Sequence, residues 1–239
     1  MSSYISLCYN TTGSGHASKG RRRGKVEPVA DKGKSEVDNY KEIMLIYNAA
    51  LKQITTKLEI LNEEFQDVHQ YNPIEHIKFR LKTVESIVNK LKKNDREVTL
   101  DNMVQYVNDI AGVRIICSFR SDIYRIADML SNQSDLTVIS VKDYIVAPKP
   151  SGYESYHMLV KIPVYLSDRI VETKVEIQIR TVAMDFWASL EHKIHYKFTG
   201  LVPDHLENEL IECAKMVSLL DARMENLNTE IQESRIPED

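Results

Sequence analysis

The chain has 239 residues, 43% of them hydrophobic and 28% charged, with a formal net charge of −4. This composition is typical of a globular protein that forms a core without a structural metal or disulfide, and the charge argues against attraction of the whole surface to nucleic acid. Three widely spaced cysteines, with no membrane-spanning apolar run and no signal peptide, predict a cytoplasmic protein without membrane contact.

Residues 1–35 differ in composition from the rest of the chain. The stretch 11–34 is rich in Gly, Ser, Lys and Arg, and Arg21, Arg22 and Arg23 stand at its centre. Such a segment buries too little apolar surface to offset the entropy lost on ordering, so we expect a disordered basic tail. An arm that contacts RNA or a membrane is the alternative, although only the positive charge favours it.

Residues 36–235 are expected to form one domain with a long amphipathic helix at each end. Apolar residues recur at helical spacing from Ile43 to Phe65, whereas residues 171–180 alternate with the period of two that predicts a strand. The expected elements are helices over 36–70, 83–93 and 99–108, a strand over 113–119, a helix over 122–130, strands over 136–146, 155–165 and 171–180, and helices over 183–198 and 203–233. This order predicts an α+β fold, a mixed β-sheet packed by helices on one side.

Two acidic residues are candidate metal ligands. Asp109 stands at a helix-to-strand turn, and Glu176 lies on the polar face of the strand over 171–180. If their strands are neighbours, both carboxylates can bind one Mg²⁺, a cation that takes oxygen ligands and keeps waters that phosphates can replace. An ordinary solvated strand face would show the same pattern.

A row of polar residues suits a polyphosphate. Lys82, Ser86 and Lys90 stand at i, i+4 and i+8, which predicts that they share one face near the start of the helix over 83–93. Lysines, a hydroxyl and the free N–H groups of a helix start all attract phosphate oxygens. A solvated helix face is the alternative.

The loop from Lys149 to His157 suits a nucleotide base. Pro150 and Gly152 shape a tight turn, Tyr153 could stack on a base, and Lys149 and His157 could reach phosphate or ribose oxygens. The alternative is an ordinary hairpin loop with a structural histidine.

Four short motifs follow one another between residues 109 and 193. They are Asp109-Ile-Ala-Gly-Val-Arg114, Lys149-Pro-Ser-Gly-Tyr-Glu-Ser-Tyr-His157, Glu176-Ile-Gln-Ile-Arg180 and Trp187-Ala-Ser-Leu-Glu-His-Lys193. In this order they resemble the synthetase domain of the Rel/SpoT homologue family, and the whole chain resembles its small alarmone synthetases. The resemblance implies a nucleotidyltransferase-like fold and an enzyme that moves the β,γ-pyrophosphate of ATP to the ribose 3′-hydroxyl of GDP or GTP, giving ppGpp or pppGpp and AMP.

The resemblance also implies roles for single residues. Mg²⁺ would bind Asp109 and Glu176, and Glu176 would also be the base for the 3′-hydroxyl. ATP would be held by Arg80 and Arg114 on either side of the adenine and by Lys82, Ser86 and Lys90 along the phosphates. The GDP or GTP site would comprise Tyr153 stacked on guanine, with Lys149, His157, Gln178 and Glu191 around it.

Assembly and related activities follow from the same resemblance. The long terminal helices suit the homotetramer of the family. No His-Asp hydrolase region precedes Glu36 in this sequence, so synthesis without hydrolysis is expected. Two alternatives remain: a toxin-like relative that pyrophosphorylates adenine nucleotides or a tRNA 3′ end, and a catalytically silent nucleotide- or RNA-binding module.

Overall fold

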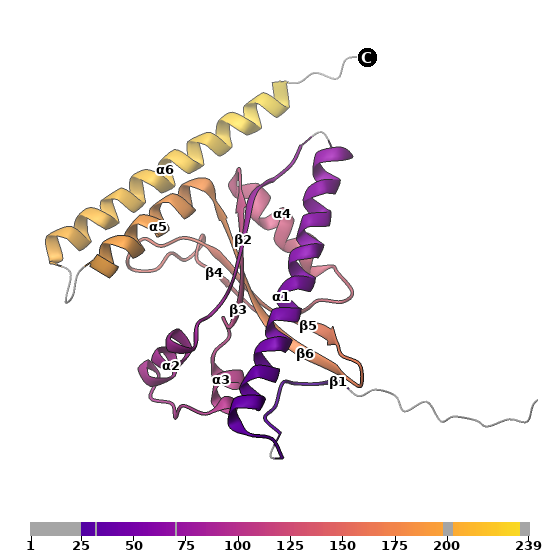
Figure 1. The fold of residues 1–239 in the computed structure, drawn as a ribbon. Coiled ribbons are helices and arrows are strands. Elements are labelled where there is room, and N and C mark those ends of the chain that lie inside the picture. Colours follow the sequence, from indigo (N-terminus) through magenta and orange to yellow (C-terminus); the bar gives the residue numbers. More distant parts are fainter. Residues whose placement is uncertain (1–24, 32, 70, 198–202, 235–239) are drawn as a thin grey trace, which may run out of the picture.

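A mixed β-sheet forms the centre of the computed structural model, which describes residues 25–31, 33–69, 71–197 and 203–234 (Figure 1). Its strands are β1 (Lys25–Val26), β2 (Ile74–Leu81), β3 (Ala111–Cys117), β4 (Thr137–Asp143), β5 (Tyr156–Tyr165) and β6 (Ile170–Thr181). The strand order is β2-β3-β6-β5-β4, with β1 beside β6. β6 runs parallel to β3 and to β1, and the other pairs are antiparallel. The predicted mixed sheet is confirmed.

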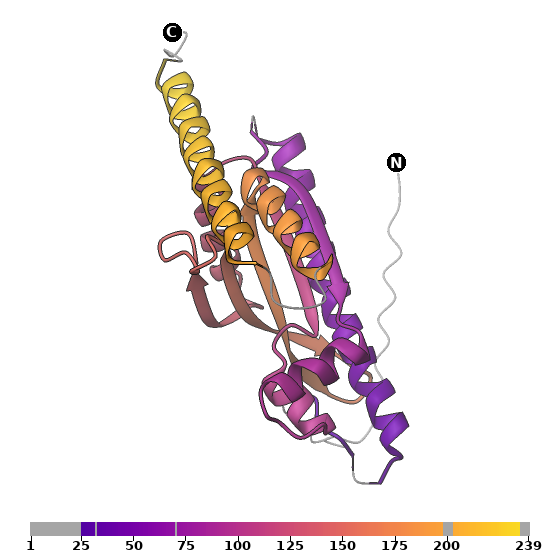
Figure 2. The same ribbon diagram turned by 90° about the vertical axis from the view of Figure 1, so that its left-hand side faces the viewer.

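Helices lie on both faces of this sheet, where only one covered face was expected. They are α1 (Glu36–Asp67), α2 (Val84–Lys93), α3 (Leu100–Tyr106), α4 (Arg120–Ser131), α5 (Val182–Lys197) and α6 (Asp204–Ser234). α1 and α4 cover one face, while α2 and α3 stand at one end of the other face and α5 and α6 at its opposite end (Figures 1 and 2). None of the described helices covers the middle of that second face (Figures 1 and 2). No helix in the described part of the chain combines the length and apolar character needed to cross a bilayer.

Side-chain caps explain where the first helices begin. Ser35 Oγ accepts a hydrogen bond of 3.2 Å from the Asp38 N–H, which satisfies one of the free donors at the start of α1. Thr83 caps α2 and Thr99 caps α3 in the same way. The predicted cap at Thr99 is therefore confirmed. The apolar stripe of α1, from Ile43 to Phe65, is buried against the sheet.

The β5–β6 hairpin confirms the predicted alternation and its turn. The Leu166 N–H donates to the Arg169 carbonyl at 2.9 Å and closes the hairpin. The five apolar-face residues of β6 that alternate from Val171 to Ile179 are at most 1% exposed, in the core beneath α1 and α4. The intervening polar residues of β6 therefore face the open side of the sheet.

Two segments differ from the expectation. Residues 74–81, expected as a link, form the edge strand β2, in which most side chains are exposed and no alternation of burial is visible. Composition predicted a tail without structure up to residue 35, yet β1 pairs with Ile170 and Val171 of β6. The expectation for residues 1–24 lies outside the described residues.

The loop between β4 and β5 packs against α6 through Gly152. Its φ of +84° is one that L side chains rarely adopt, and a Cβ placed there would lie 2.4 Å from the Ala214 Cβ. We expect Gly152→Ala to lower the free energy of unfolding by about 2–4 kcal/mol, the sum of a left-handed backbone penalty and an overpacked contact. Urea unfolding measures this loss.

The control for that substitution removes the opposing methyl group. In Gly152→Ala with Ala214→Gly, the contact is relieved and only the backbone strain and the glycine in α6 remain. The losses of unfolding free energy in the two single variants should therefore sum to more than the loss in the double variant. Strict additivity would contradict the predicted clash.

Candidate active site

Side chains from three adjacent strands meet at the centre of the open sheet face. Glu176 of β6 pairs with Gly112 of β3, and Gln178 pairs with Arg114 of β3 on one side and with His157 of β5 on the other. Because paired residues in neighbouring strands point to the same face, Arg114, Gln178 and His157 form one row across the sheet. Four predicted site residues are thus brought together by strand register alone.

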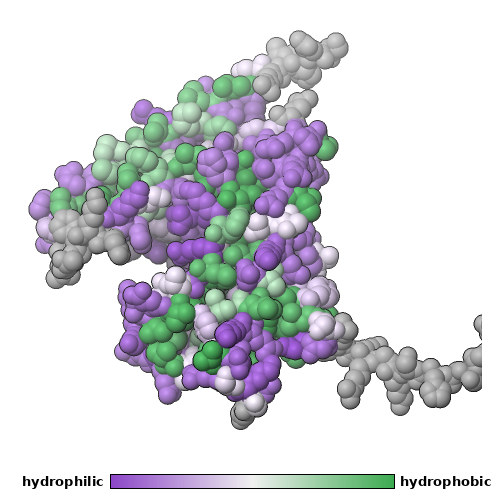
Figure 3. Space-filling model, in the orientation of Figure 1, coloured by the Kyte–Doolittle hydropathy of each residue, from purple (hydrophilic) through white to green (hydrophobic). Residues whose placement is uncertain are grey.

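A cavity of about 260 Å³ lies on this face. Arg80, Arg114, Glu176 and Gln178 line it, so it contains residues expected in the ATP site and in the acceptor site. The surface is hollowed between the part that carries α5 and α6 and the part that carries α2 and α3 (Figure 3). A larger cavity of about 610 Å³ lies beside α1, lined by none of the motif residues.

Asp109 lies at the turn before β3 and binds two lysines. Each of its two carboxylate oxygens forms an ion pair of 2.7 Å, one with Lys82 Nζ and the other with Lys90 Nζ. The Lys82 N–H also donates to the Ile110 carbonyl at 2.8 Å, which fixes the end of β2 beside this turn. Lys82 precedes the Thr83 cap, so the expectation that it shares a helix face with Ser86 and Lys90 is wrong.

These ion pairs keep Asp109 ionised. Burial alone would raise the pKa of its carboxyl, but the hydrogen bonds and positive charges of Lys82 and Lys90 outweigh burial and lower the pKa below the ordinary value. The turn therefore presents a carboxylate that already binds positive charge.

The donor set at this turn fits Mg²⁺. Proteins commonly hold Mg²⁺ through one or two carboxylates and leave its other positions to water and substrate phosphates. Asp109, which precedes β3, and Glu176, which pairs with Gly112 of β3, supply that number. Among the described residues, no three His, Cys, Asp or Glu side chains gather as metal ligands would.

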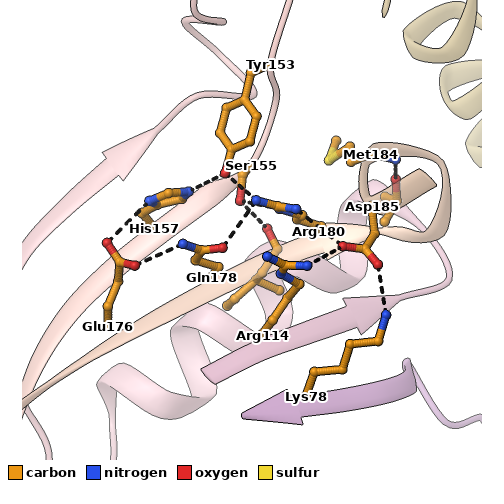
Figure 4. A network of polar contacts seen from close by, with 12 residues as sticks. Lys78, Arg114, Tyr153, Ser155, His157, Glu176, Gln178, Arg180, Met184 and Asp185 are labelled. Atoms are coloured by element: carbon orange, nitrogen blue, oxygen red, sulfur yellow. Dashed lines mark hydrogen bonds and ion pairs between the residues drawn. The ribbon is translucent and has the colours of Figure 1, made fainter. Parts of the chain in front are cut away.

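Glu176 is held by polar neighbours on its own strand and on β5. Gln178 Nε2 donates to Glu176 Oε2 at 2.9 Å, and His157 Nδ1 lies 3.8 Å from Glu176 Oε1 (Figure 4). The second contact is too long for a hydrogen bond, and it would be an ion pair only if His157 were protonated.

His157 is neutral at physiological pH. Burial, followed by the positive charges of Arg180 and Lys149, lowers its pKa from the ordinary 6.5 to about 3. Its Nε2 instead shares a 2.9 Å hydrogen bond with the Tyr153 hydroxyl. The contact with Glu176 is therefore a polar contact between a neutral ring and a carboxylate.

This shift predicts a pH-dependent contribution of His157 to stability. As the pH falls from about 6.5 to about 3, the unfolded chain takes up a proton on His157 that the folded chain does not. The free energy of unfolding should fall across this window by up to about 1.4 kcal/mol per pH unit. Urea unfolding of His157→Gln between pH 7 and pH 4 should show a shallower fall than the wild type, and equal slopes would contradict the assignment.

Tyr153 lies between cations rather than in open space. Lys149 Nζ is 4.6 Å and the Arg180 guanidinium carbon 4.9 Å from the centre of its ring. Lys149 also lies 4.9 Å from the ring centre of Tyr144, which meets Tyr153 edge to face. The loop thus forms an aromatic and cationic wall, the chemistry expected for a base and phosphate site.

Two predicted residues, Ser86 and Glu191, lie on helices and not on the strands of the sheet. Ser86 is exposed in the first turn of α2, and its Oγ accepts a 2.9 Å hydrogen bond from the Thr83 hydroxyl. Glu191 is partly exposed on α5. Their expected roles in nucleotide binding stay predictions.

A cluster of ion pairs around the buried Asp185, at the start of α5, was not predicted. Asp185 accepts from Arg114 at 3.0 Å, from Lys78 at 3.2 Å and from Arg180 at 3.3 Å. Burial would raise its pKa, but Lys78, Arg114 and Arg180 together lower it. Arg180 falls in the alternating polar face of β6, so sequence could place it on this face, but no pattern indicated that Asp185 would meet it.

Known proteins are similar to this chain in sequence and in fold. A family model described as "Region found in RelA / SpoT proteins" matches residues 79–200. The GTP pyrophosphokinase YwaC of Bacillus subtilis is 48% identical over 198 residues, which cover 83% of this chain and 94% of that protein.

Solved structures agree with the sequence match. The small alarmone synthetase 2 of Bacillus subtilis superimposes with a TM-score of 0.73 at 47% identity, covering 80% of this chain and 99% of that one. The small alarmone synthetase 1 of the same organism, bound to its product pppGpp, gives a TM-score of 0.75 at 34% identity, with 81% and 98% covered. The chain therefore belongs to the RelA/SpoT family and, within it, to the small alarmone synthetases.

Proposed function

We propose that this protein is a GTP pyrophosphokinase, which transfers the β,γ-pyrophosphate of ATP to the ribose 3′-hydroxyl of GDP or GTP. The observation that carries the proposal is the open sheet face, where Glu176 lines a cavity together with Arg80 and Arg114, and where Asp109 pairs with Lys82 and Lys90 at the turn before β3. A 48% identical relative has the name GTP pyrophosphokinase, and the structure of a 34% identical one contains its product pppGpp.

ATP would lie between the edge strand and α2. Arg80 and Arg114 both line the cavity, and planar guanidinium groups stack well on a base. Lys82 and Lys90 bind Asp109 here and would turn to the phosphates of the nucleotide, with Ser86 nearby at the start of α2. Two lysines beside one carboxylate suit a transfer in which charge neutralisation and positioning supply most of the catalysis.

GDP or GTP would lie against β5 and β6. Tyr153 would stack on guanine once Lys149 moves from its ring to a phosphate, a change that an exposed lysine makes readily. His157, Gln178 and Glu191 would surround the nucleotide. The ribose 3′-hydroxyl would then face Glu176.

The transfer itself needs one proton acceptor. The 3′-oxygen attacks the β-phosphorus of ATP, the bond from that phosphorus to the oxygen bridging the α- and β-phosphates breaks, and AMP leaves. Glu176 would take the hydroxyl proton as the new bond forms. A Mg²⁺ bound at Asp109 and Glu176 would neutralise charge on the phosphates.

The same proposal includes a homotetramer in the cytoplasm. α6 presents a row of large exposed apolar side chains, and contiguous apolar surface of this kind usually marks an interface. The row comprises Met216, Leu219, Leu220, Met224, Leu227 and Ile231. Analytical ultracentrifugation would measure a mass of four chains if the proposal holds.

The activity is tested with purified protein, Mg²⁺, ATP labelled at the γ-phosphate, and GDP, GTP or GMP in turn. A labelled guanosine tetra- or pentaphosphate supports the proposal and ranks the acceptors. Label on adenine nucleotides or added tRNA would indicate the toxin-like alternative instead. Nucleotide binding without any transfer would indicate a silent binding module.

A further inference from the structure

Arg180 occupies the centre of the polar network beside Glu176 (Figure 4). It is 4% exposed and donates through all three guanidinium nitrogens. Nε donates to Ser155 Oγ at 3.2 Å, Nη1 to Asp185 Oδ1 at 3.3 Å, and Nη2 to Gln178 Oε1 at 3.2 Å and to the Tyr153 hydroxyl. A planar fork with these four acceptors can sit in one orientation only.

The Arg180 guanidinium determines how the Gln178 amide is oriented. A guanidinium only donates, so Gln178 must present its amide oxygen to Arg180 and its Nε2 to Glu176, at 2.9 Å. The Tyr153 hydroxyl likewise accepts from Arg180, and it shares a 2.9 Å hydrogen bond with His157 Nε2. The other ring nitrogen of His157, Nδ1, faces Glu176 Oε1 at 3.8 Å.

Two chains of contacts, or arms, therefore lead from one arginine to the two oxygens of the same carboxylate, one ending in the hydrogen bond from Gln178 Nε2 and the other in the His157 ring nitrogen at 3.8 Å. We infer that Arg180 is a positioning residue for the transfer: held by Asp185, it aims Glu176 through Gln178 on one arm and through Tyr153 and His157 on the other. This inference rests on the proposed function, in which Glu176 faces the 3′-hydroxyl. A base misplaced by about 1 Å can lose on the order of 10²-fold in rate, so fixing its carboxylate matters.

When Arg180 is substituted, its neighbours keep other hydrogen-bond and ion-pair partners, so the variants should still fold. Asp185 keeps Arg114 and Lys78, and Ser155 keeps its bond to the Ile179 carbonyl. Arg180→Gln removes the fork and its charge. Arg180→Lys keeps the charge but cannot bond Gln178, Tyr153 and Asp185 together. Arg169→Gln, at the opposite end of the same hairpin, is the matched control, since that arginine pairs with Glu42 and Asp168 on the surface.

The test measures steady-state kinetics and thermal unfolding of the full chain for each variant. We expect both Arg180 variants to lower kcat by about 10- to 100-fold while KM for ATP stays within about twofold, and Arg169→Gln to behave as the wild type. Adding Tyr153→Phe to Arg180→Gln should cost less than the two separate losses combined, because one arm is already broken. Normal kcat in Arg180→Lys, or losses that only follow the unfolded fraction, would overturn the inference.

A second readout is independent of activity. Crystal structures of the wild type and Arg180→Gln, both without nucleotide, should show the Glu176 carboxylate and the Gln178 amide displaced in the variant. An unmoved carboxylate would overturn the positioning role even in an active enzyme. If the wild type transferred no pyrophosphate, the proposed function would fail, and this comparison would still decide whether Arg180 orients Glu176.

Discussion

Glu176→Gln is expected to lower kcat by about 10³-fold, within the range that general bases contribute. The amide cannot accept the proton of the 3′-hydroxyl and is a weaker ligand for Mg²⁺. Its size is unchanged, and Gln178 and His157 remain beside it, so the fold should persist. KM for ATP should change little, because Arg80, Lys82 and Lys90 are untouched.

Initial rates and nucleotide binding together check this expectation. Glu172→Gln is the matched control, because Glu172 lies on the same face of β6, four residues before Glu176, and does not line the cavity. It should retain wild-type kcat. If Glu176→Gln turned over at a near-normal rate, Glu176 would not be the base.

Asp109→Asn is expected to lower kcat by about 10²–10³-fold, the usual effect of removing one electrostatic partner of the transition state. The neutral amide loses affinity for Mg²⁺ and also leaves Lys82 and Lys90 close together without the charge that they share. The Mg²⁺ concentration at half-maximal rate should therefore rise.

A Mg²⁺ titration of the initial rate measures this change. Asp101→Asn, an exposed acid in the first turn of α3, is the control and should follow the wild-type curve. An unchanged Mg²⁺ requirement in Asp109→Asn would show that Asp109 orients the two lysines and does not hold the metal.

Periodic segments of the fold could be predicted from sequence. β6 alternates strictly because one face is buried beneath α1 and α4, and Thr99 is recognisable as a cap because a side-chain oxygen must satisfy the first N–H groups of a helix. β2 has no such signature. It is an edge strand whose Phe79 is 54% exposed, so neither alternation nor an apolar run marks it.

The motifs predict individual residues of the site but not the contacts between elements that are far apart in the sequence. Strand register brings Arg114, Gln178 and His157 into one row, which the motifs anticipate without giving the strand order. The ion pairs of Asp185 with Lys78 and Arg180 join two strands to a helix, and contacts of this kind depend on tertiary packing. The prediction that Lys82 lies on a helix is wrong, because α2 begins only after its cap residue Thr83.

The most direct measurement of the central claim follows the β-phosphate of ATP, which reaches the acceptor only if the whole pyrophosphate is transferred. ATP labelled at the β-phosphate is incubated with Mg²⁺ and the wild-type protein, with GDP or 3′-deoxy-GDP as the acceptor. We predict label on GDP in equal amount to the AMP released, and none on 3′-deoxy-GDP. Release of ADP in place of AMP, or label on the 3′-deoxy acceptor, would contradict a pyrophosphate transfer to the 3′-hydroxyl.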